Sequence, residues 1–190
     1  MYKSIIENIR KVVDLNDSEV AVFNRFVETH HFKKKEIILQ ESKVCQKLYF
    51  VEKGCLRMYF INKKGVEHIT QFAFDGWWIS DFQSLMNHTP SDYYIQAIEE
   101  SNIVSIDNQQ LDILLTELPQ LEKYFRILMQ KAVAGAQLRS KLLYAMSKEE
   151  FYFHFSTSFP DFMVRVPQYM IASYLGLTPE YLSELRKKKL

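Results

Sequence analysis

Hydrophobic and polar positions follow three successive patterns along the 190 residues of the chain. Apolar residues recur at helical spacing up to about residue 31, and they do so again from Asp107 onward. Between these regions, short runs of β-branched and aromatic residues alternate with polar turns, as in an antiparallel sandwich or roll. The pattern therefore predicts an α+β chain in which helices flank an antiparallel sheet.

The expected strands lie between residues 32 and 107, with turn signals at Lys53-Gly54 and at Asn62–Gly65. They are Glu36–Gln40, Lys47–Val51, Leu56–Ile61, His68–Phe74, Tyr93–Ile98 and Ile103–Ile106. One long excursion, from Asp75 to Asp92, interrupts their rhythm. Because long structured loops between strands often carry function, we expect a binding loop there.

Two short helices are expected before the sheet. The second begins at Asn16, which forms a capping box with Glu19, and we interpret His30 and His31 as its C-terminal end. The two histidines are adjacent rather than at metal-ligand spacing, so we expect no metal there.

A long helix is predicted from about Pro119 to Met146. Its apolar positions are Leu118, Leu121, Phe125, Leu128, Ala132, Gly135, Leu142 and Met146. Steps of three and four over this length favour a coiled-coil partner, and small residues near Gly135 would let two backbones approach closely. Arg139 interrupts the stripe, which leaves open a helix that lies on its own domain.

The following segment predicts a further helix and then a helix-turn-helix. Ser147 and Glu150 form a second capping box, and the helix that they open ends in the segment 156–161. Pro167 is expected at a first helical position, and Gly176 at the left-handed residue of a tight turn.

The last helix is expected to start at Thr178 as N-cap, with Pro179 and Glu180 in its first turn and Leu182 and Leu185 on its apolar side. In a helix-turn-helix, this second helix would lie in a DNA major groove. An ordinary helical hairpin with a solvated lysine tail is the alternative.

Charge and composition narrow the class of protein. The net charge is +1, but residues 165–190 hold five basic and two acidic residues, up to Lys189, so this segment carries +3 and the rest −2. A basic end on a near-neutral body favours a local polyanion contact. Cys45 and Cys55 are expected to be free thiols in a reducing cytoplasm, and no signal peptide or membrane-spanning run is recognised.

The motifs of hydrolases, phosphate-binding loops and zinc enzymes are absent from the sequence, so we expect no enzyme and no catalytic residue.

The order helix, β-roll, long helix and helix-turn-helix resembles the bacterial CRP/FNR family of transcription regulators. The resemblance covers nearly the whole chain and is carried by Gly54, Leu56-Arg57, Gly65, Phe74-Asp75-Gly76, Ile171–Gly176 and Thr178–Ser183. It implies a cyclic-nucleotide-binding-like roll of the double-stranded β-helix or jelly-roll type in residues 1–117, a dimerisation helix in 118–146 and a DNA-binding domain in 147–190. It also implies a homodimer on a near-palindromic operator, and it leaves RNA polymerase open as a further partner.

The ligand loop departs from the family pattern. In members that bind cyclic AMP, a Glu after the loop glycine holds the ribose, and an Arg with a neighbouring Ser or Thr holds the phosphate. Counting along this sequence places Trp77 at the Glu position, Ser91 at the Arg position and Asp92 beside it. Because a phosphodiester needs a cation and aligned donors when it leaves water, we expect cyclic AMP to bind poorly or not at all.

The degenerate ligand site comprises Gly76, Trp77, Trp78, Phe82, Ser91, Asp92 and Tyr93. Its aromatic residues either form a pocket for another small ligand or simply fill the site. Other cofactors of the family are not expected, because an iron–sulfur cluster needs about four cysteines and the midchain His68 and His88 suit strand or loop positions better than a haem.

The resemblance also gives roles to the last helix. Glu180, Tyr181, Ser183 and Glu184 are expected to face base edges, and Arg186, Lys187 and Lys188 to lie closer to phosphates. Thr178 would meet a phosphate at the helix start. Many members have a base-contacting Arg where this chain has Glu184, so a small-ligand or interaction module with a vestigial helix-turn-helix remains the alternative.

Overall fold

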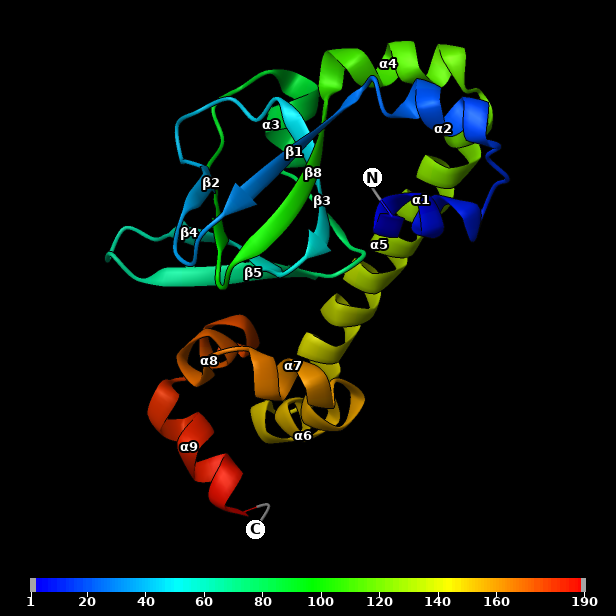
Figure 1. Ribbon diagram of the computed structural model, residues 1–190. Coiled ribbons are helices and arrows are strands. Elements are labelled where there is room, and N and C mark those ends of the chain that lie inside the picture. Colours follow the sequence, from blue (N-terminus) through cyan, green and yellow to red (C-terminus); the bar gives the residue numbers. More distant parts are fainter. Residues whose placement is uncertain (1–2, 189–190) are drawn as a thin grey trace. The chain divides into compact units, whose positions relative to one another are not determined.

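The computed structural model describes residues 3–188, which excludes Lys189 (Figure 1). The described residues form two compact units. We call residues 3–60 and 71–129 the roll unit, and residues 61–70 and 130–188 the C-terminal unit. The long helix α5 (Gln120–Ala145) contributes its first turns to the roll unit and the rest to the C-terminal unit.

The strands form two four-stranded sheets, with the orders β1-β8-β3-β6 and β2-β7-β4-β5. Their bounds are β1 (Val27–Phe32), β2 (Ile37–Leu39), β3 (Lys47–Lys53), β4 (Cys55–Ile61), β5 (Glu67–Phe74), β6 (Trp78–Ile79), β7 (Tyr94–Ala97) and β8 (Ser101–Asp107). Six of these strands confirm the runs predicted from the sequence, with ends that differ by up to two residues. The β1–β8, β3–β8 and β4–β7 pairs are antiparallel, as predicted.

The prediction that His30 and His31 end a helix is wrong, because both lie in β1. Helix α2 (Asp17–Phe23) ends earlier, although its capping box of Asn16 and Glu19 is confirmed. Pairing with β8, with His30 opposite Ile103, outweighs the local preference of this segment.

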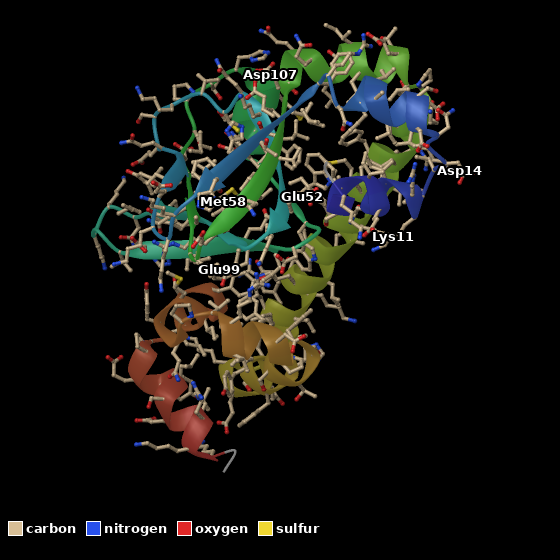
Figure 2. All side chains as sticks on the ribbon, viewed as in Figure 1. Lys11, Asp14, Glu52, Met58, Glu99 and Asp107 are labelled. Carbon is tan, nitrogen blue, oxygen red and sulfur yellow. The ribbon has the colours of Figure 1, made fainter. Side chains whose placement is uncertain are left out.

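The helices of the roll unit cover its apolar interior. They are α1 (Lys3–Arg10), α2, α3 (Phe82–Asn87), α4 (Asn108–Glu117) and the start of α5. The core combines residues of both sheets, among them Phe50 and Ile95, with Ile5 and Ile9 of α1. Glu52 on β3, labelled in Figure 2, accepts hydrogen bonds from the first backbone amides of α1 at 2.9–3.2 Å and so holds that helix end.

The C-terminal unit contains α6 (Lys148–Ser158), α7 (Pro160–Arg165), α8 (Gln168–Leu175) and α9 (Pro179–Lys188). The capping box of Ser147 and Glu150 is confirmed. Helix α7 was not expected, because the segment around Pro160 was interpreted only as a stop, whereas proline also suits the first turn of a new helix. Pro167 precedes α8 as its N-cap instead of occupying the first helical position.

An aromatic cluster around Phe155 holds the helices of the C-terminal unit together. The Phe155 ring lies 4.9 Å from Phe162, 5.7 Å from Tyr174 and 6.4 Å from Phe151, measured between ring centroids. Edge and tilted contacts of this kind add to the apolar area that the rings bury.

Arg139, the residue that interrupts the apolar stripe of α5, makes contacts within the C-terminal unit. Its guanidinium donates to the backbone oxygens of Thr70 at 3.2 Å and Tyr174 at 2.8 Å, and its Cζ lies 4.2 Å from the centroid of the Tyr174 ring. The Ser173 hydroxyl accepts from the amide of Ile69 and donates to the oxygen of Glu67. The Arg139 side chain is therefore held by contacts within this unit.

The turn between β3 and β4 has no room for a side chain, so Gly54→Ala should lower the free energy of unfolding by about 3 kcal/mol or more. Gly54 has φ +119°, and an added Cβ would lie 2.2 Å from the Ser101 hydroxyl oxygen and 2.7 Å from the Ser101 Cα. Gly76→Ala is the matched control, because Gly76 also has positive φ but ordinary space. It should cost about 1 kcal/mol. Urea unfolding followed by tryptophan fluorescence compares the two, and equal losses would contradict the steric argument.

Candidate DNA-binding helix and candidate ligand site

Helices α8 and α9 are joined by the tight turn that the sequence predicts. Gly176 has φ +68°, in the left-handed region, and the amide of Leu177 donates to the oxygen of Ala172 at 2.8 Å. Ala172 and Leu182 are fully buried, which is consistent with the close approach of the two helices. The geometry is that of a helix-turn-helix.

Helix α9 presents a continuous polar face. The Thr178 hydroxyl accepts a hydrogen bond from the amide of Tyr181 at 3.2 Å, so Thr178 caps the helix as predicted. Leu182 and Leu185 point inward, and Tyr181 is half-buried. The remaining predicted DNA-binding residues are all exposed: Thr178, Glu180, Ser183, Glu184, Arg186, Lys187 and Lys188.

The charges of α9 are sorted along its length. Glu180 lies in the first turn, and Arg186, Lys187 and Lys188 lie in the last turn, where each sign suits the helix dipole. Lys188 Nζ lies 3.1 and 3.2 Å from the two carboxylate oxygens of Glu149. This ion pair is partly exposed and therefore weak, so a phosphate can compete for the lysine.

Burial raises the pKa of the Tyr152 hydroxyl on α6, and the positive charge of Arg186 opposes that shift. The Lys188–Glu149 ion pair links the same end of α9 to α6. The cationic end of α9 thus extends across Arg186 toward α6, and it includes the exposed Lys187.

In the roll unit, the segment between Asp75 and Asp92 is more ordered than the sequence indicated. It contains the short strand β6, which pairs with β3, and the helix α3. Its two tryptophans face opposite environments, since Trp77 is 53% exposed and Trp78 is 8% exposed. Trp78 is therefore a core residue, and Trp77 lies on the surface.

Ser91 contacts an acidic residue that the sequence analysis missed. The Ser91 hydroxyl donates to Asp81 Oδ2 at 2.6 Å, while Asp81 Oδ1 accepts from the amides of Gln83 and Ser84 at the start of α3. Asp81 and Ser91 are both buried. Asp81 is the N-cap of α3, a position that Asp before an apolar run signals locally.

The arrangement around Asp81 is unfavourable for an anionic ligand. The Ser91 hydroxyl, at the expected phosphate position, already donates a hydrogen bond to the Asp81 carboxylate. The first backbone amides of α3, which could otherwise bind an anion, donate to the same carboxylate. A phosphate would meet a negative charge there rather than a cation.

The other predicted ligand-site residues are dispersed. Phe82 and Asp92 are exposed, and Tyr93 is half-buried with its ring edge-on to Phe60. A cavity of about 590 Å³ exists in the roll unit, but it lies at the α1–α2 turn, where Lys11 and Asp14 are labelled in Figure 2. None of the seven predicted residues lines that cavity.

Two further properties of residues 3–188 bear on other functions. Across these residues, no three His, Cys, Asp or Glu side chains are close enough to hold a metal ion. In the same part of the chain, every helix is too short or too polar to cross a bilayer.

Comparison with known proteins agrees with this architecture. Residues 29–117 match the cyclic nucleotide-binding domain model. The chain is 28% identical over 184 residues to an anaerobic regulatory protein of Pasteurella multocida, covering 90% of this chain and 66% of that protein. It is also 28% identical to a fumarate and nitrate reduction regulatory protein of Vibrio cholerae, covering 90% of this chain and 72% of the relative.

The solved structure of FixK2 from Bradyrhizobium japonicum is similar in fold, with a TM-score of 0.69, 19% identity, and coverage of 85% of this chain and 83% of that one. The match of this chain spans 66% of the length of the Pasteurella multocida protein and 72% of the length of the Vibrio cholerae protein. The combination of a cyclic-nucleotide-binding-like roll, a long helix and a helix-turn-helix defines a class of DNA-binding regulators. These similarities support a DNA-binding transcription regulator of the CRP/FNR type.

Asp81→Ala should lower the free energy of unfolding by about 2 kcal/mol, because it removes the cap of α3 and the nearest acceptor of the buried Ser91 hydroxyl, which is left with the Tyr93 oxygen at 3.2 Å. Asp92→Ala, a change of the same kind at an exposed position, should alter stability by less than about 0.5 kcal/mol. Urea unfolding measures both. A loss at Asp92 as large as that at Asp81 would show that the Asp81–Ser91 pair is not what holds this loop.

Proposed function

We propose that this chain acts in the cytoplasm as a homodimeric regulator that binds a near-palindromic DNA operator and is not controlled by cyclic AMP. The observation that carries the proposal is the exposed polar face of α9 on a correctly capped helix-turn-helix. RNA polymerase is a natural further partner for such a regulator. The vestigial alternative draws on Glu184, but a carboxylate at that position can still accept a hydrogen bond from cytosine.

Within α9, base edges meet Glu180, Ser183 and Glu184, with Tyr181 at the margin of that face. Arg186, Lys187 and Lys188 lie toward the phosphates, and Thr178 meets a phosphate at the amino end of the helix. These roles are supported by the exposure of the residues and by the position of each along the helix.

The dimer interface is proposed on the face of α5 that this chain leaves uncovered. Beyond residue 130, helical spacing gathers Ala132, Val133, Ala136, Leu143 and Tyr144 on one side, and all five are exposed. Arg139 lies at the edge of this face, three residues after Ala136 and four before Leu143, and its guanidinium reaches the backbone oxygens of Thr70 and Tyr174. A second copy that packs on this small-residue face would bury its apolar side chains and pair two α9 helices for a two-fold operator.

The interface is tested by a matched pair of substitutions. Ala136→Asp places a charge in the proposed face, whereas Ala134→Asp places the same charge on another side of the same exposed helix. Light scattering coupled to gel filtration should give a monomer for Ala136→Asp and a dimer for Ala134→Asp. A dimer in both variants would refute this face, and a monomeric unsubstituted protein would refute the homodimer.

The phosphate contacts are tested by salt dependence. A duplex is first selected from a random pool with the unsubstituted protein, and its affinity is then measured at several salt concentrations. Replacing Arg186 and Lys187 by Ala should weaken binding and make the slope of log K against log salt shallower by about 3.5, since a dimer loses four phosphate contacts.

Replacing Lys33 and Lys34, two exposed lysines of the roll unit, by Ala removes the same charge and should leave the slope unchanged. Equal slopes in all three proteins would show that Arg186 and Lys187 do not contact phosphates.

Titration of the dimer with cyclic AMP in a calorimeter should give no binding heat at concentrations up to about 1 mM, because Asp81 and Ser91 satisfy each other where a phosphate would need a cation. Saturable binding in the micromolar range would contradict this part of the proposal.

A further inference from the structure

Three polar side chains form a hydrogen-bonded network inside the roll unit, which we call the Tyr124 network. Trp78 Nε1 donates to the Tyr124 hydroxyl at 2.8 Å, and that hydroxyl lies 2.8 Å from Asn8 Oδ1, to which it donates. Asn8 Nδ2 donates to the backbone oxygen of Gly76 at 3.1 Å. The network therefore joins α1, α5 and the segment that leads into β6.

The Tyr124 network is embedded among aromatic rings. Tyr124 is 2% exposed and Trp78 is 8% exposed. The Trp78 ring lies 5.3 Å from Phe50 on β3 and 5.7 Å from Phe125 on α5. Burial raises the pKa of Tyr124 to about 12, so its hydroxyl keeps its proton at neutral pH and remains a donor to Asn8.

Such a network allows the first turns of α5 few alternative positions. A shift of α5 along β6 would separate the Tyr124 hydroxyl from the indole N–H and from Asn8, and each group would stay buried without a partner. An effector can act on a protein only by favouring one of two accessible arrangements. The Tyr124 network gives one arrangement of α5 on the roll a large advantage without any ligand.

A second, independent observation concerns the ligand loop. The Asp81–Ser91 pair and the start of α3 satisfy one another, so the loop is ordered by contacts within the chain. Both the loop and the helix that would respond to a ligand are thus held by the protein's own side chains.

We propose that the Tyr124 network takes the place of a small-molecule effector and fixes the start of α5, so that the dimer binds its operator without any ligand. This inference rests on the proposed function as a homodimeric DNA-binding regulator. Tyr124 is a positioning residue in this scheme, because it acts on DNA through α5.

The first arm of the test measures ligand independence. The purified dimer is examined by native mass spectrometry, and its affinity for a duplex selected from a random pool is measured on the same sample. We expect the mass of two polypeptides with no added small molecule, together with saturable binding to the duplex.

The second arm measures the role of the hydroxyl. Tyr124→Phe keeps the ring but removes both hydrogen bonds, and Trp78→Phe removes only the indole donor. Tyr94→Phe is the control, because its hydroxyl bonds to Glu41 at the surface of the same unit. We expect Tyr124→Phe to remain a folded dimer but to bind the duplex at least tenfold more weakly, with a smaller loss for Trp78→Phe and none for Tyr94→Phe.

Hydrogen exchange of the amides in residues 121–128 separates positioning from general destabilisation. At a temperature where all the proteins are folded, exchange there should be at least tenfold faster in Tyr124→Phe than in Tyr94→Phe, with the C-terminal unit unchanged. Uniformly faster exchange throughout the protein would indicate lost stability alone and would overturn the proposal.

The remaining outcomes are distinct. Binding of the duplex only when a cell extract or a nucleotide is added would overturn the inference and leave the regulator function intact, as would unchanged affinity in Tyr124→Phe. Failure of the unsubstituted protein to select any duplex would overturn the proposed function itself, and this inference with it.

Discussion

A hydroxyl group buried in an apolar core needs partners, and this requirement restricts where the first turns of the long helix can lie on the roll. The Tyr124 hydroxyl accepts a hydrogen bond from the indole of Trp78 on β6 and donates one to the side-chain amide of Asn8 on α1. Apolar contacts alone would tolerate small slips between α5 and the roll, because they are not directional. The hydrogen bonds remove that tolerance, and they give α5 a fixed beginning from which its later turns extend.

The later turns of α5 carry both side chains that contact the rest of the C-terminal unit and side chains that stay exposed. Arg139 and its face contact the C-terminal unit through Tyr174 and Thr70. Ala136 and Leu143, one turn before and one turn after Arg139, are exposed. Arg139, which interrupts the apolar stripe in the sequence, therefore has a structural role, because it binds Thr70 and Tyr174 between exposed apolar positions of the helix.

Local signals in the sequence were sufficient for much of the fold. The capping boxes at Asn16 and Ser147 and the left-handed Gly176 act through residues only a few positions apart, so the sequence alone places them correctly. The strand at His30 was missed because its structure depends on pairing with β8, more than 70 residues away.

The candidate ligand site shows the same limit. The Asp81–Ser91 bond could not be predicted because it joins two loop positions whose approach depends on β6 and α3. Burial of Trp78, as opposed to Trp77, likewise follows from the pairing of β6 with β3, which local composition does not encode. Sequence reasoning identified the right segment, and tertiary contacts decided what each side chain in it does.

The Asp81–Ser91 pair also bears on how such a roll could change over evolutionary time. If an arginine arose at position 91, its guanidinium would find Asp81 already beside it and would be neutralised in an internal ion pair. A single substitution would then be silent toward phosphate esters. A response of this loop to anions would require at least two changes, with the first giving no advantage, and this tends to preserve the present state of the loop.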